Sequence, residues 1–154
     1  MYVAFTFIMF LAALIIQTSM LGWLTCKPDI VLVIVVYLGL MKGPEIGCLS
    51  GFFSGLMLDA FSGVPFGTNA LSKIILGFVS GIVGKRLYTQ SLITHILCVA
   101  IATAIDTLIV LSFQGFELHW QKFMLYEILE NIVCCPVIVL LFRAGERRLR
   151  TTTY

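Results

Sequence analysis

Glycines recur at every fourth position at the start of the apolar segment 43–71. The repeat runs through Gly43, Gly47, Gly51 and Gly55 and ends in Asp59. Residues four apart share one face of a helix, so the spacing predicts an apolar helix whose glycine stripe ends in a carboxylate. In a helix exposed to water, each glycine costs about 1 kcal/mol relative to alanine. In lipid the same stripe lets a second helix approach closely, which favours a packed membrane helix.

The composition of the chain is that of a membrane protein. Of its 154 residues, 60% are hydrophobic and 12% are charged, whereas a soluble domain carries about 25% charged residues. Apolar runs predict helices over 3–24, 30–41, 44–61, 69–87, 92–113 and 122–142. We therefore expect an all-α integral membrane protein, a compact bundle of about six transmembrane helices in a single domain over residues 1–154.

The second predicted helix is unusually short. Its twelve residues, 30–41, cover roughly 18 Å at about 1.5 Å per residue, less than the ~30 Å core of a bilayer. The segment either spans the membrane with both ends sheltered by protein, or it forms a re-entrant helix buried in the bundle.

Small residues and a turn connect the third and fourth predicted helices. The fourth helix carries Gly77 and Gly81, which can meet the glycine stripe of the third. Between the two helices lies a turn composed of residues typical of tight turns, namely Ser62, Gly63, Pro65 and Gly67.

The basic residues predict an orientation. Lys42, Lys85, Arg86 and the four arginines of the tail 143–154 fall on one side of a six-span topology. Basic residues concentrate on the cytoplasmic side, so we expect a cytoplasmic C-terminal tail. The tail can also contact anionic membrane lipid. A re-entrant second segment would change the side of the N-terminus, which stays open.

Polar residues of four predicted helices converge on one depth near the outer surface. They are Asp59, Lys73, Asp106, Glu127, Glu130 and Asn131. Three interpretations stay open. The groups can be solvated at the interface, or Asp59 and Lys73 can pair and hold two helices together. Alternatively, the cluster lines an outward-facing cavity that takes a ligand or a segment of a partner protein.

The motifs of common enzymes are missing from the chain. There is no Ser-His-Asp set, no HExxH sequence and no phosphate-binding glycine loop. The two histidines, His95 and His119, are predicted on opposite sides of the membrane, which argues against a metal site. We expect no enzymatic activity, no cofactor, no metal and no nucleic acid partner.

The segment 28–71 carries most of a family resemblance. Its matching residues are Pro28, Asp29, the apolar run 31–40, Gly43, Gly47, Gly51, Phe52, Gly55, Leu56, Asp59, Ser62, Gly63, Pro65, Gly67, Ala70 and Leu71. In the last predicted helix, Glu127, Asn131 and Pro136 precede the basic tail. In these positions, in length and in number of spans, the chain resembles MreD, the bacterial rod-shape-determining membrane protein family.

The resemblance implies a non-enzymatic scaffold of the cell-wall elongation machinery in the bacterial inner membrane. It implies binding of an MreC-like single-span protein, in a larger assembly with MreB, RodA and a class B penicillin-binding protein. It also implies a fold similar to the substrate-binding components of energy-coupling-factor transporters. That similarity keeps an alternative function open, a small-molecule-binding subunit of a transporter.

Overall fold

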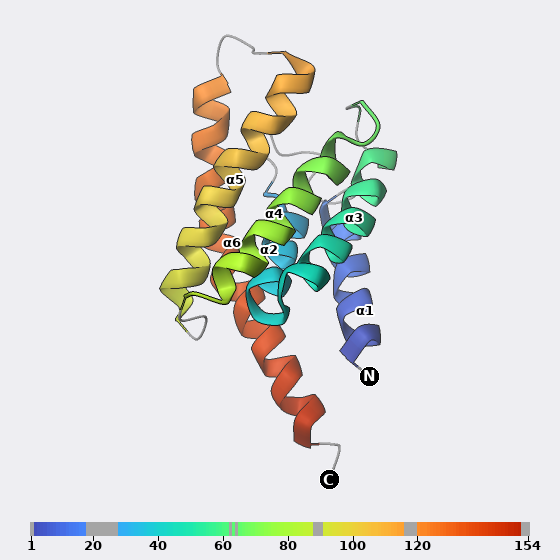
Figure 1. The fold of residues 1–154 in the computed structure, drawn as a ribbon, viewed down its shortest axis with the longest axis vertical. Helices are drawn as coiled ribbons and strands as arrows, with labels where there is room; N and C mark the ends of the chain where they lie inside the picture. The colour runs from blue at the N-terminus through green and yellow to red at the C-terminus, as the bar shows by residue number, and fades with distance from the viewer. Residues whose placement is uncertain are drawn as a thin grey trace.

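The structure is a computed structural model that describes residues 2–17, 28–61, 63, 65–87, 91–115 and 120–151. These residues form six helices, α1 (Tyr2–Ile15), α2 (Ile30–Lys42), α3 (Pro44–Phe61), α4 (Thr68–Gly84), α5 (Leu92–Gln114) and α6 (Trp120–Thr151). Successive helices run in alternating directions, so α1 begins and α6 ends at the same lower end of the view (Figure 1). Predicted residue Ser62 and the predicted helical residues 18–24 lie outside the described residues.

Helix α2 is the centre of the bundle and contacts each of the other five helices (Figure 1). Every residue from Val31 to Leu40 is buried, because the helix is apolar on all sides. Asp29 caps its first turn by accepting a hydrogen bond from the Leu32 backbone N–H at 2.9 Å. Gly43 ends it with a φ of 101°, a conformation that favours glycine. Other parts of the protein therefore surround this short helix over most of its length.

Helices α3 and α4 pack with their backbones in contact. A Cβ atom on Gly47 would overlap the carbonyl oxygen of Gly77, and one on Gly77 would overlap the carbonyl of Gly47. Added atoms on Gly51 and Gly55 would likewise strike the α4 backbone at Lys73 and Ala70. Gly43 differs from the rest of the stripe, because it has open space at its own Cβ position. The stripe therefore places α3 against α4, and Gly43 instead forms the corner between α2 and α3.

The outer surface of the bundle carries many large apolar side chains, while several charged and polar side chains are buried. Large apolar side chains on the outer surface include Val133, Ile93 and Phe53, which are 70%, 69% and 60% exposed. Meanwhile Lys73, Asp106 and Asn131 are only 0%, 3% and 0% exposed. In water, exposed apolar side chains in this number are unfavourable, whereas in a bilayer they face lipid. Their number is typical of a membrane protein.

Helix length bears on the expectation of about six transmembrane helices with a short second one. Within the described ranges, two helical stretches are long and apolar enough to cross a membrane by themselves, Leu92–Phe113 and Trp120–Gly145. Shorter apolar helices lie at Thr6–Ile15, Ile30–Lys42 and Thr68–Gly84. Helix α6 also differs from its predicted end at residue 142, because it continues through the arginine-rich segment to Thr151. The all-helical prediction is confirmed. Among the described helices, α5 and α6 are the ones long and apolar enough to cross a bilayer by themselves.

Candidate functional site

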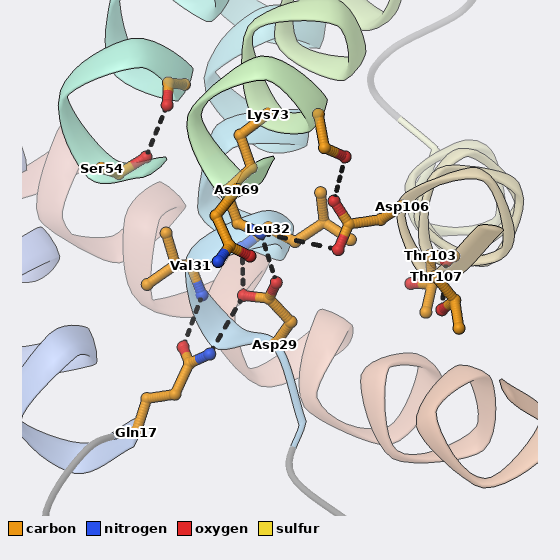
Figure 2. Close-up of polar contacts among 12 residues, drawn as sticks. Gln17, Asp29, Val31, Leu32, Ser54, Asn69, Lys73, Thr103, Asp106 and Thr107 are labelled. Carbon is orange, nitrogen blue, oxygen red and sulfur yellow. Dashed lines mark hydrogen bonds and ion pairs between the residues drawn. The ribbon is translucent and has the colours of Figure 1, made fainter. Parts of the chain in front are cut away.

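A buried lysine joins three helices. The Nζ atom of Lys73, on α4, lies 2.7 Å from Oδ2 of Asp29 at the start of α2 and 3.5 Å from Oδ2 of Asp106 on α5. Figure 2 shows the lysine side chain pointing between the two carboxylates. The Ser72 hydroxyl donates a hydrogen bond to the other oxygen of Asp106. Removing one partner of an ion pair this deeply buried is costly, because the other partner is left as a charge with neither a counter-ion nor solvent around it.

Asp29 extends this network to Gln17, which follows the end of α1. Its Oδ1 accepts a hydrogen bond from the Gln17 side-chain amide at 3.3 Å, and the Gln17 carbonyl oxygen accepts one from the Val31 backbone N–H at 3.3 Å. Figure 2 shows Asp29 between Gln17 and Lys73. We define the buried charge network as Gln17, Asp29, Ser72, Lys73 and Asp106. Asp29 was not among the predicted site residues, although its position before an apolar helix is typical of a capping residue.

A second set of polar contacts joins α5 to α6. The Thr107 hydroxyl lies 2.9 Å from Oε2 of Glu127, and the Asn131 side-chain amide donates to Oγ1 of Thr103 at 2.9 Å. We call these four residues the α5–α6 polar seam. Glu130 is half-buried beside it, and its Oε2 atom is enclosed without a hydrogen-bond partner. The two threonines were not predicted as site residues, since a threonine in an apolar helix carries no distinctive sequence signal.

Asp59 lies at the start of α4 and does not have its expected role as a partner of Lys73. Its carboxylate accepts hydrogen bonds from the backbone N–H groups of Gly67, Asn69 and Ala70, each at 3.0 Å, and from the Asn69 side-chain amide at 3.0 Å. These N–H groups belong to the unsatisfied first turn of α4, which favours a negative charge. The prediction of an Asp59–Lys73 pair is therefore wrong, because the ammonium group of Lys73 forms its ion pairs with Asp29 and Asp106.

The turn between α3 and α4 completes this cap. Gly67 has a φ of 97°, which presents its N–H to Asp59. The carbonyl of Pro65 accepts hydrogen bonds from the backbone N–H and the hydroxyl of Thr68, at 3.2 and 2.8 Å. Gly63 is exposed, with open space around it. The described residues of the turn thus contribute hydrogen bonds at the start of α4.

The predicted polar residues do not form a single cavity. Lys73 and Asp106 meet in the buried charge network, Glu127 and Asn131 lie in the α5–α6 polar seam, and Asp59 caps α4. A groove of about 280 Å³ lies elsewhere, between α1 and α6 over α2, and apolar side chains such as Ala12, Ile34 and Val137 line it. Lys73, Asp106, Glu127, Asn131 and Asp59 therefore make their contacts at three separate places, and none of these residues lines the groove.

The comparisons with known proteins agree with a structural role. The sequence model of one family, described as rod shape-determining protein MreD, matches residues 1–144. No curated protein and no solved structure matches the chain, so the expected similarity to substrate-binding components of energy-coupling-factor transporters finds no support. The match covers almost the whole chain, including every helix that supplies the two polar sites. The chain belongs to the MreD family of rod shape-determining membrane proteins.

Proposed function

We propose that this protein is a non-enzymatic scaffold of the cell-wall elongation machinery that binds an MreC-like single-span protein. Membership of the MreD family carries the proposal, because that family determines rod shape. The geometry of the polar groups supports it. Lys73, Asp29 and Asp106 pair with one another inside the bundle, so they are not free to bind a solute or to act on a substrate.

We assign partner contacts to the exposed apolar helix faces rather than to the acids. Asp106 and Asn131 are buried, and a protein docking on the outside cannot reach them. By contrast, α3 exposes Leu49, Phe53 and Phe61. In lipid, a partner helix associates with such a surface through van der Waals packing. MreB, RodA and a class B penicillin-binding protein are the expected members of the larger assembly.

Copurification tests the binding proposal. The tagged protein is coexpressed with the MreC-like protein of the same organism, and with an unrelated single-span protein as a control. We expect the MreC-like protein to be retained in detergent and the unrelated protein to be lost. Failure of the MreC-like protein to copurify, together with retention of a soluble metabolite, would replace the scaffold with a solute-binding subunit.

We further propose a multi-pass protein of the inner membrane with a cytoplasmic C-terminus. The alternating helices and the basic end of α6 support this orientation. In a cysteine-free background, Arg150→Cys should resist an impermeant thiol reagent applied from the periplasm, whereas Lys122→Cys at the opposite end of α6 should react. Periplasmic labelling at position 150 would reverse the orientation.

A further inference from the structure

The groove between α1 and α6 is lined by apolar side chains from three helices. Ala12 belongs to α1, and Ile34 of α2 is buried beneath the groove. On α6, Val133, Val137 and Leu141 line it at intervals of four residues, so they form one strip along that helix. Val133 and Val137 are also 70% and 58% exposed. This strip therefore faces the surroundings of the bundle, which in a bilayer are lipid.

The groove occupies one half of the membrane-crossing length of α6. The stretch Trp120–Gly145 is long and apolar enough to cross a bilayer by itself, and its middle lies near Ile132. The strip from Val133 to Leu141 lies between that middle and the basic end of the helix. At about 1.5 Å per residue the strip is roughly 12 Å long, compared with roughly 15 Å for half of a hydrocarbon core. The groove thus matches the depth of a single leaflet.

This depth distinguishes two apolar occupants. A transmembrane helix of a partner protein crosses both leaflets through about 20 residues and packs along its neighbour in both. An acyl chain extends from a headgroup at the surface to the middle of the bilayer, which is one leaflet only. Because the strip on α6 ends near the middle of the span, an acyl chain fits the groove better than a helix does.

Basic residues follow the strip at the end where a headgroup would lie. Residues 143–150 hold four arginines and one acid, Glu146, and α6 continues as a helix through all of them. Arg143 comes two residues after Leu141. Arg148 follows Leu141 by seven residues, so it occupies the same side of the helix. A basic segment directly outside the hydrocarbon core attracts lipids with anionic headgroups. Along α6 the apolar strip and the arginines thus have the same order as the acyl chain and the phosphate of a lipid.

We propose that the groove between α1 and α6 is a lipid-binding site. It holds one acyl chain of a phospholipid whose anionic headgroup lies beside the arginines of α6. The lipid belongs to the leaflet on the side of the C-terminal tail. Its chain fills the space between α1 and α6, because close packing in a bilayer leaves few voids. The site is separate from the buried charge network and from the exposed side chains of α3.

Native mass spectrometry of the full-length protein tests whether the groove holds a lipid. The protein is reconstituted in vesicles with equal amounts of phosphatidylglycerol and phosphatidylcholine, and then released into a mild detergent. We expect the wild type to retain one phosphatidylglycerol molecule. Ala12→Phe should lose it, because a large side chain would occupy the groove. Ala60→Phe is the matched control, since Ala60 is an exposed alanine of α3. Equal retention by the wild type and Ala12→Phe, or no retention by the wild type, would overturn the proposal.

The headgroup is tested by a change in lipid preference. Arg148→Gln should reduce the preference for phosphatidylglycerol over phosphatidylcholine about fivefold, because one basic residue near an anionic surface contributes about 1 kcal/mol. The variant should still retain one lipid, since the groove itself is unaltered. An unchanged preference would contradict the position of the headgroup beside the arginines.

Photocrosslinking locates the acyl chain in the unaltered protein. Vesicles of phosphatidylglycerol with a diazirine on the acyl chain should give crosslinks on groove residues such as Val137, and excess unlabelled phosphatidylglycerol should remove them. Crosslinks spread evenly over the exposed side chains of α3 and α5 would mean that only bulk lipid is present, and would overturn the proposal. None of these measurements includes a protein partner, so their failure would leave the scaffold proposal intact.

Discussion

Replacing Gly51 by leucine should destroy most of the folded protein. A Cβ atom at Gly51 would strike the carbonyl oxygen and carbon of Lys73 and the backbone nitrogen of Ile74. These are backbone atoms in the interior of α4, which cannot rotate away as a side chain can. Forcing extra atoms into a packed interface costs about 1–3 kcal/mol, and we expect Gly51→Leu to reach or exceed the upper end. The displacement of α4 would also move Lys73 away from both of its carboxylates.

Thermal unfolding in detergent and the yield of monodisperse protein measure this effect. Gly51→Ala should be damaging to a smaller degree, because a methyl group demands a smaller separation of the helices. Gly63→Leu is the matched control, since Gly63 is exposed and has no atom near its Cβ position. Its effect should stay within about 0.5 kcal/mol. Equal stability of Gly51→Leu and the wild type would mean that α3 and α4 are not in backbone contact.

Replacing Lys73 by methionine should be comparably severe. The substitution keeps the length of the side chain but leaves Asp29 and Asp106 as buried carboxylates without a cation. Removing one partner of a buried ion pair costs about 3–5 kcal/mol. Asp29 also caps α2 through Leu32, so repulsion between the two carboxylates would disturb the first turn of the central helix.

A double-mutant cycle separates the ion pair from the loss of side-chain packing. Because Asp106→Asn removes one of the two unpaired charges, it should restore part of the stability lost in Lys73→Met. The coupling between the two substitutions should be about 0.5–3 kcal/mol. Lys85→Met serves as the control, because Lys85 is exposed at the end of α4. Strict additivity of Lys73→Met and Asp106→Asn would show that these side chains do not interact.

Some features of this protein follow from its sequence alone because they depend on neighbours along the chain. Apolar runs predicted an all-helical fold, and the structure has six helices in its described part. Four-residue spacing placed Gly47, Gly51 and Gly55 on one helix face, and this face lies on α4. From the sequence, the uniformly apolar segment 30–41 could either span the membrane or be buried within the bundle as a re-entrant helix. In the structure it forms α2 and is buried. The family was likewise predicted from sequence and is confirmed by the match to residues 1–144.

The partners of the charged groups were decided by the tertiary structure. Asp59 and Lys73 lie near each other along the chain, yet Asp59 caps α4 and the lysine turns to Asp29, which precedes it by 44 residues. Because a buried ammonium group gains most where carboxylates converge in space, its partners depend on how the helices pack. The same holds for Thr103 and Thr107, whose hydroxyl groups acquire a role only when α6 lies beside α5. Helix periodicity fixes which face a residue occupies, but only the packed bundle determines what that face meets.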